Sequence, residues 1–168
     1  DNAPDLMSGA HNQSGETIYA PRVVSGEIAF LMRSALNSAI YGEQGQGWKG
    51  TSRALANDFK RKDIGGKTGT TNQSKVTWYA GFGANIVTTV YVGFDDNKRV
   101  LGRGESGART AMPAWKEYMK VALADKQDRK IEVPVNIVEA KVDATSGFLG
   151  NSLTEYFIKG TEPMKKFV

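Results

Sequence analysis

The sequence predicts an α+β fold in which helices flank an antiparallel sheet. Two segments rich in β-branched and aromatic residues, 76–82 and 86–94, are separated by only three residues. So short a connection predicts an antiparallel hairpin. Apolar residues repeat with helical spacing in segment 25–42, before the hairpin, and in segment 110–123, after it. Apolar faces of this kind are typical of helices that cover a sheet.

Length and composition favour a single globular domain. The chain has 168 residues, of which 40% are hydrophobic and 24% charged, unlike a disordered chain. No apolar run approaches a membrane span, and residues 1–4 lack the pattern of a signal peptide. The absence of cysteine excludes disulfides and a thiol nucleophile, and the single histidine, His11, excludes a histidine metal cluster. A Ser-His-Asp triad would have to use His11, in a predicted loop.

The charge balance is mildly basic. Twenty-two Lys and Arg against 18 Asp and Glu give a net charge of +4, which permits an anionic partner without demanding one. Basic residues are scattered except at 60–62, and so short a run is typical of a solvated face. A nucleic-acid-binding domain would show steeply salt-dependent binding, and nothing beyond the mild charge supports it.

The first half of the chain predicts one long helix and two weaker elements. Residues 1–16 are predicted to be loop, and 17–24 to be a short strand broken by a proline. Ser25 is the expected N-cap of the long helix and Gly42 its end. Its apolar face is assigned to the core and comprises Ile28, Leu31, Met32, Ala35, Leu36, Ala39 and Ile40. Residues 42–50 are expected to form a glycine-rich loop, followed by a short helix at 51–60 with Ala54, Leu55 and Phe59 on one side.

The strand patterns assign faces to the predicted hairpin. The first strand places Val76, Trp78, Ala80 and Phe82 on one face. The second has apolar residues on both faces, with Ile86, Val90, Val92 and Phe94 on one and Val87 and Tyr91 on the other. That pattern predicts a strand covered on both sides. If residues 67–71 are extended, they add a third strand.

The second half predicts another covering helix and a less regular end. Thr110 is the expected cap of this helix, with Pro113 in its first turn. Its apolar face comprises Trp115, Tyr118, Met119, Ala122 and Leu123. Segment 126–130 is predicted to be a charged linker, 133–142 a strand, 144–147 a turn and 154–168 a tail with the single apolar cluster 156–158.

The stretch Gly65-Gly66-Lys67-Thr68-Gly69-Thr70-Thr71-Asn72 carries the chemical signal. A phosphate-binding loop would need glycine at position 61, where Arg61 stands, and a helix after Thr68, where strand patterns follow. Lys-Thr-Gly is also one of three motifs of serine β-lactamases and penicillin-binding proteins. Acyl transfer to serine needs a backbone N–H aimed at the developing oxyanion, which an exposed strand can supply. Lysine and hydroxyl groups can bind the carboxylate of a peptide.

A longer string of motifs resembles the C-terminal part of the transpeptidase domain of class A, bifunctional penicillin-binding proteins, most closely the 1A type of Gram-negative bacteria. The resemblance runs from about residue 17 to the end. Its segments are Pro21–Ser25, Arg61–Asn72, Trp78–Phe82, Val92–Asp96, Gly107-Ala108, Ala111–Trp115, Tyr118-Met119, Val142-Asp143, Ser146-Gly147 and Phe157 with Gly160–Pro163. The resemblance implies a partial serine β-lactamase-like fold, with 1–130 as the C-terminal portion of the transpeptidase domain and 131–168 as a C-terminal extension.

The resemblance also implies roles for residues of the motif. Lys67 and Thr70 are the expected catalytic residues, Lys67 within the charge network of the nucleophile and Thr70 through a backbone N–H that forms half of the oxyanion hole. Thr68, Gly69, Thr70 and Thr71 are expected to bind substrate. Trp78 would brace the motif strand or simply pack in the core. No metal or cofactor is implied.

Two features depart from the family pattern. Val76 and Thr77 precede Trp78, where the family commonly has an acidic residue. None of the ten serines is followed three residues later by lysine, and none begins a Ser-x-Asn motif. A serine enzyme of this type needs Ser-x-x-Lys for its nucleophile and base. The chain is therefore expected to be a fragment, cut after the second motif and inactive alone.

For the parent protein, the resemblance implies a peptidoglycan synthase at the periplasmic face of the bacterial inner membrane, held there by an N-terminal helix. Its transpeptidase would crosslink stem peptides through an acyl-serine intermediate, and β-lactams would acylate the same serine. No nucleic acid is expected as a partner. Loss of neighbouring elements would leave an unpaired sheet edge and uncovered apolar surface, so the fragment is expected to self-associate, swap elements or be only marginally stable. The alternatives are a stand-alone, non-catalytic module that binds peptidoglycan or a protein partner, and a β-lactamase.

Overall fold

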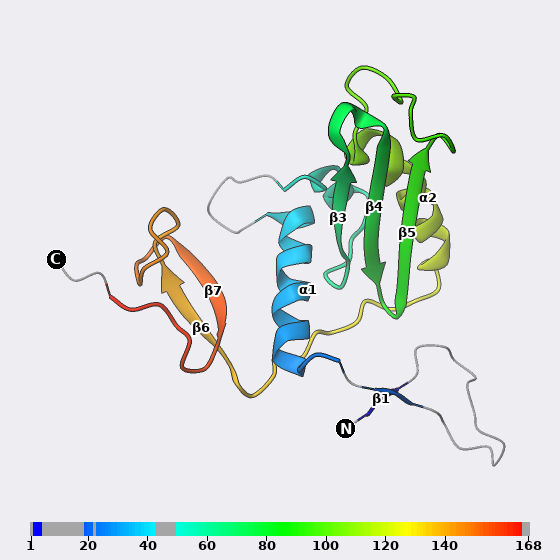
Figure 1. Cartoon of the computed structure of the whole chain (residues 1–168). Coiled ribbons are helices and arrows are strands. Elements are labelled where there is room, and N and C mark those ends of the chain that lie inside the picture. The colour runs from blue at the N-terminus through cyan, green and yellow to red at the C-terminus, as the bar shows by residue number, and fades with distance from the viewer. Residues whose placement is uncertain (1, 5–18, 22, 43–49, 166–168) are drawn as a thin grey trace, which may run out of the picture.

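The computed structural model describes residues 2–4, 19–21, 23–42 and 50–165 (Figure 1). In chain order the elements are β1 (Asn2–Pro4), β2 (Tyr19–Pro21), α1 (Gly26–Tyr41), the 3₁₀ turn η1 (Arg53–Asn57), β3 (Gly65–Thr70), the 3₁₀ turn η2 (Asn72–Ser74), β4 (Val76–Gly83), β5 (Ile86–Gly93), the π-helical turn η3 (Gly107–Ala111), α2 (Met112–Ala122), β6 (Ile137–Val142) and β7 (Leu153–Ile158). The predicted α+β class is confirmed.

The central feature is an antiparallel sheet with strand order β3-β4-β5. Helix α2 covers one of its faces, and α1 lies along the β3 side, between this sheet and the separate hairpin of β6 and β7 (Figure 1). The predicted hairpin is therefore confirmed, and β3 supplies the third strand expected around residues 67–71.

The face expected from the apolar residues of β4 is the wrong one for the core. Thr77 and Tyr79 are buried, whereas Trp78 is 42% exposed, and of the expected face Val76 alone is buried. Glycine explains the inversion, because the buried face carries Gly81 where α2 comes close. A β-carbon added to Gly81 would lie 2.7 Å from the indole of Trp115. The small residue thus makes room for a large one.

Strand β5 is covered on one face only, contrary to the prediction. The indole N–H of Trp115 donates to the carbonyl oxygen of Thr88 at 3.1 Å, which fixes α2 over that face. On the other face Val87 is 73% exposed and Tyr91 is 49% exposed. Among the described residues β5 pairs only with β4, so its outer edge has no strand partner.

Helix α1 has the predicted ends. The hydroxyl of Ser25 accepts a hydrogen bond from the N–H of Ile28 at 3.3 Å. Gly42 ends the helix with a positive φ of 71°, a conformation that favours glycine.

The predicted core face of α1 is only partly correct. Ile40 is buried, but Ile28 and Met32 are exposed. From Arg33 onward α1 approaches the sheet, with the guanidinium of Arg33 5.1 Å from the ring centroid of Phe82 in β4 and the backbone of Leu36 against Gly65 of β3. Nearer its beginning, Phe30 is buried instead and packs edge-on against Tyr156 of β7, with ring centroids 5.0 Å apart.

The predicted cap of α2 is wrong. The hydroxyl of Thr110 donates to the carboxylate of Glu105 instead, because Thr110 lies within η3, one turn before the helix. Pro113 stands in the first turn, as predicted. Of the predicted apolar face, Tyr118 is exposed and Ala122 is half-buried, while Trp115, Met119 and Leu123 contribute to one core with residues of η1 and the sheet. The buried members of this core are Ile40, Leu55, Phe59, Ile64, Tyr79, Ala111, Met112, Trp115, Met119 and Leu123.

The predictions for the two ends of the chain and for segment 51–60 are only partly correct. Residues 2–4, predicted to be loop, form β1 and pair with β2, which covers residues 19–21 of the strand predicted at 17–24. Residues 23 and 24 are described and lie outside any strand. Residues 153–158, predicted to belong to a tail, form β7 and pair with β6. The short helix is the 3₁₀ turn η1, with Leu55 and Phe59 buried and Ala54 exposed. His11 and most of the loop at 42–50 lie outside the described residues.

Candidate active site at the edge strand β3

The Lys-Thr-Gly motif lies on a strand with one side open. Strand β3 pairs with β4 alone among the described residues. Just beyond it, the N–H of Thr71 donates to the carbonyl oxygen of Val76 at 3.0 Å, in register with the pairs along β3. Ladder bonds alternate along an antiparallel pair. The N–H groups of Thr68 and Thr70 therefore point away from β4, toward anything that lies along the strand.

The ammonium group of Lys67 lies beside these donors and is not neutralised by a carboxylate of the described residues. Its side chain is exposed, and its ammonium group donates to the hydroxyl of Thr68 at 3.2 Å and to the carbonyl oxygen of the same residue at 3.1 Å. It forms no ion pair within the described part of the chain. Its positive charge is thus available to an anion at the edge of the sheet.

Glycine is needed at positions 66 and 69 of the motif for different structural reasons. A β-carbon on Gly66 would lie 2.5 Å from the phenol oxygen of Tyr79, so packing of the core requires glycine there. A β-carbon on Gly69 would lie 3.2 Å from the β-carbon of Trp78, its cross-strand partner. Without a side chain at position 69, the exposed face of β3 has no group that would collide with Trp78 or cover the strand beside it.

The hydroxyl of Thr70 is oriented by a residue to which the sequence assigned no role. The N–H of Gly107, at the start of η3, donates to it at 3.0 Å. A β-carbon on Gly107 would lie 2.5 Å from the carbonyl oxygen of Trp78, so only glycine lets η3 come this close. Because its oxygen already accepts a bond, the Thr70 hydroxyl can donate its own proton to a ligand.

Thr71 is engaged in the turn that follows. Its hydroxyl accepts a hydrogen bond from the N–H of Val76 at 2.9 Å and lies 3.2 Å from the carbonyl oxygen of the same residue. Of the predicted site residues, Lys67, Thr68, Gly69 and Thr70 lie along the open edge, and Thr71 closes the connection to β4.

A buried carboxylate fixes the chain just before β3. Asp63 is fully buried and binds the guanidinium of Arg61 through both oxygens, each at 2.9 Å. It also accepts from the N–H groups of Ala84 at 3.1 Å and of Arg129 at 2.9 Å. Burial alone would raise the pKa of Asp63, but these bonds outweigh it and lower the pKa to about 2.

A second carboxylate, that of Asp128, holds the same stretch of chain. Asp128 accepts the N–H groups of Lys62 at 2.9 Å and Asp63 at 3.1 Å. Arg61 in turn donates to the carbonyl oxygens of Lys126 and Gln127. We call residues 61–63 and 126–129 the clasp. It joins the start of β3 to the segment that leaves α2, and so fixes where the motif strand begins.

Two features of the described residues bear on the surroundings of the site. Within the described ranges no group of three or more potential metal-binding side chains forms a cluster. No described helix is both long enough and apolar enough to cross a bilayer. Two hollows of the described surface lie beside the clasp and α1, lined by residues other than those of β3.

Comparisons with known proteins identify relatives. No family model matches the chain. Penicillin-binding protein 1A of Haemophilus influenzae is 64% identical over 170 residues, which cover 100% of this chain and 20% of that protein. The chain belongs to the penicillin-binding protein 1A family. The Escherichia coli member is 43% identical over 172 residues, which cover 93% of this chain and 20% of that protein.

A solved member of the family shares the fold. The crystal structure of penicillin-binding protein 1A from Haemophilus influenzae matches with a TM-score of 0.87 and 66% identity, over 92% of this chain and 23% of that one. The α+β arrangement described above is therefore that of part of a penicillin-binding protein. The chain spans about one fifth of the length of the curated relatives that it matches.

Proposed function

We propose that β3 is one wall of the substrate cleft of a peptidoglycan DD-transpeptidase. The observation that carries the proposal is the open edge of β3. There the outward N–H of Thr70 lies beside the ammonium group of Lys67, which forms no ion pair with any described residue. An extended peptide can lie along such an edge as an additional strand. The names of the relatives, which call them penicillin-binding, support a site that β-lactams also occupy.

In this proposal each motif residue has a role in acyl transfer. A serine hydroxyl attacks the carbonyl carbon of the terminal D-Ala–D-Ala bond, D-alanine leaves with a proton, and the acyl group then passes from serine to an amine of a neighbouring strand. The N–H of Thr70 supplies half of the oxyanion hole. The hydroxyls of Thr68 and Thr70 bind the substrate carboxylate, with Lys67 contributing charge near the nucleophile. Gly69 leaves room for the peptide, and Thr71 holds the end of the strand.

The nucleophile would come from sequence outside this chain, since no serine here begins Ser-x-x-Lys. Residues 1–130 would then be the C-terminal portion of the transpeptidase domain and 131–168 a C-terminal extension. The hairpin of β6 and β7, on the far side of α1 from the sheet, supports this division (Figure 1). The whole protein would act at the periplasmic face of the bacterial inner membrane as a peptidoglycan synthase.

The first test is acylation by a penicillin, measured by intact mass. We expect this chain alone to keep its mass, because it holds one wall of the site without the nucleophile. A longer protein that carries the upstream part of the family sequence should gain one penicillin. In that protein Lys67→Ala should slow acylation by about 10² or more, the contribution typical of proton transfer by a positioned side chain.

The matched control is Lys60→Ala, which removes an exposed lysine outside the motif strand and should leave the rate unchanged. A stoichiometric adduct on this chain alone would contradict the placement of the nucleophile. If Lys67→Ala and Lys60→Ala acylate equally fast in the longer protein, the role of β3 is wrong. Binding of this chain to isolated peptidoglycan without any acylation of the longer protein would favour the stand-alone module instead.

We also propose that the isolated chain self-associates through β5. This strand contains no charged residue and no proline, and native edge strands usually carry such residues to prevent pairing. We expect light scattering to show a dimer or larger species at micromolar concentration. Val87→Lys, at a 73% exposed position, should shift the population toward monomer. A stable, monodisperse monomer before the substitution would contradict the proposal.

A further inference from the structure

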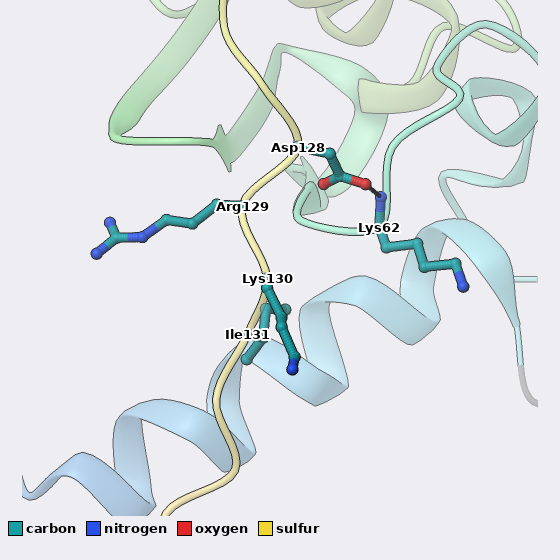
Figure 2. Close-up of a pocket in the computed structure, with 5 residues that line it drawn as sticks. All are labelled: Lys62, Asp128, Arg129, Lys130 and Ile131. Atoms are coloured by element: carbon teal, nitrogen blue, oxygen red, sulfur yellow. Dashed lines mark hydrogen bonds between the residues drawn. The ribbon is translucent and has the colours of Figure 1, made fainter.

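A hollow opens between the beginning of α1 and the extended segment 129–134. It has a volume of about 410 Å³ and is lined by Gly26, Ala29, Phe30, Arg33, Arg129, Lys130, Ile131, Glu132 and Pro134. A second hollow of about 450 Å³ shares Arg129, Lys130 and Ile131 with the first and reaches Lys62 and Asp128 (Figure 2). The two form one groove along α1, on the clasp side of the molecule.

The first hollow carries more positive than negative charge. Its lining holds the cations Arg33, Arg129 and Lys130 and the single carboxylate Glu132, so three positive charges against one negative leave +2. The carboxylate of Glu27, in the first turn of α1, does not line the hollow and accepts a hydrogen bond from the amide of Asn136 at 3.2 Å. An anion that enters this hollow would therefore meet a net attraction.

The three cations form no ion pairs within the described residues. Arg33 stacks over the ring of Phe82, with its guanidinium carbon 5.1 Å from the ring centroid. It makes one long hydrogen bond to the carbonyl oxygen of Asp63, at 3.4 Å, and its buried Nε has no acceptor. Burial lowers the pKa of Arg33, Asp63 opposes that shift, and Arg129 adds to it by repulsion. Two guanidinium groups that repel each other across a hollow are stabilised by an anion between them.

The donor set favours an oxyanion with several acceptor atoms. A guanidinium offers a planar fork that binds phosphate through two parallel hydrogen bonds, and a lysine adds a mobile point charge. The hollow also adjoins Gly26, the first residue of a 16-residue helix, whose N-terminal end has a partial positive charge. Its volume exceeds that of a bare phosphate ion, so a phosphate attached to a larger body fits better.

We propose that this hollow binds a phosphate ester, with Arg33 and Arg129 gripping the phosphate and Lys130 closing over it. The ester is either a soluble phosphorylated compound or the headgroup of an anionic phospholipid, since both present the same group. Nothing in the proposal depends on the function of β3, which lies elsewhere on the molecule.

The test is a titration of the Val87→Lys form of this chain, which we expect to be monomeric, with glycerol 3-phosphate at constant ionic strength, followed by amide chemical shifts. We expect saturable shifts at Gly26, Ala29 and Ile131. Arg129→Ala should weaken the binding about tenfold or more, as the loss of a charged hydrogen bond predicts. This variant keeps the backbone N–H that the clasp uses, so it should still fold. Arg103→Ala, at an exposed position outside the hollow, should bind as the parent chain does.

A second arm identifies the source of the phosphate. Pelleting with phosphatidylglycerol vesicles but not with phosphatidylcholine vesicles, lost in Arg129→Ala, would indicate a lipid headgroup. Glycerol 3-phosphate binding without pelleting would indicate a soluble ester. The proposal is overturned if the shifts do not saturate, or if Arg129→Ala and Arg103→Ala weaken binding equally in either arm.

Discussion

Asp63→Asn should lower the free energy of unfolding by about 3–5 kcal/mol, the cost of breaking a buried ion pair by removing one partner. Arg61, whose side chain is only 12% exposed, would keep its charge without a carboxylate. The amide could not accept all four of the bonds that reach Asp63 from Arg61, Ala84 and Arg129. Urea unfolding at pH 7 measures the loss.

The matched control is Asp96→Asn. Asp96 pairs with Arg99 at 3.2 Å, but the two side chains are 43% and 64% exposed. Exposed pairs of this kind contribute little to stability because water and salt screen them. If Asp96→Asn is as costly as Asp63→Asn, burial is not what makes the clasp important.

The same carboxylate sets a dependence on pH. Its pKa is about 2 in the folded chain, against an ordinary value of 3.8. Below its folded pKa the group is protonated in both states, and above about pH 4 it is ionised in both. Its contribution to stability is therefore complete above about pH 4 and is lost as the pH falls toward 2. Asp63→Asn should unfold with a smaller dependence on pH across that interval.

Trp115→Ala should lower the free energy of unfolding by about 3–5 kcal/mol, as expected when a large aromatic side chain is removed from a core. Trp115 is fully buried. Its ring centroid lies 4.9 Å from that of Tyr79 and 6.0 Å from that of Phe59. The substitution would leave a cavity between α2 and β4, opposite Gly81, which has no side chain to fill it.

Two further variants keep this prediction decisive if Trp115→Ala fails to fold. Trp115→Phe retains part of the ring volume but loses the bond to Thr88, so it should be destabilised by less than Trp115→Ala. Tyr118→Ala removes a 54% exposed aromatic ring from the same helix and should change stability by about 0.5 kcal/mol or less. Equal losses for Trp115→Phe and Tyr118→Ala would contradict the position of Trp115 at the centre of the core.

Local patterns predicted most of the central elements. The spacing of apolar residues located α1 and α2, and Ser25 and Gly42 gave the ends of α1 because capping depends on a few neighbouring residues. The short turn at 83–85 gave the pairing of β4 with β5. The motif strand β3 was expected to be extended and is so, while the catalytic roles of its residues remain predictions.

What depended on distant residues could not be predicted in the same way. The face of β4 was assigned from its apolar side chains, but the core lies on the face of Gly81, where Trp115 arrives from α2. Arg61 belonged to a basic run expected to be solvated, yet it is held by Asp63 and by the carbonyl oxygens of the segment after α2. The hydrogen bond from Gly107 to the hydroxyl of Thr70 depends on the tertiary approach of η3 to β3, which no local pattern indicates.

The clasp also bears on how the chain opens. Its two halves, 61–63 and 126–129, bracket the sheet and α2 in sequence and bind each other directly. Segments whose ends are tied together tend to exchange their amide hydrogens as one cooperative unit. The sheet and α2 should therefore open together, whereas the hairpin of β6 and β7, which lies outside the bracket, can separate first. The amides of β3 that bond to β4 then share the slow exchange of the whole bracketed unit, even though the strand lies at an edge, where fraying would otherwise be expected.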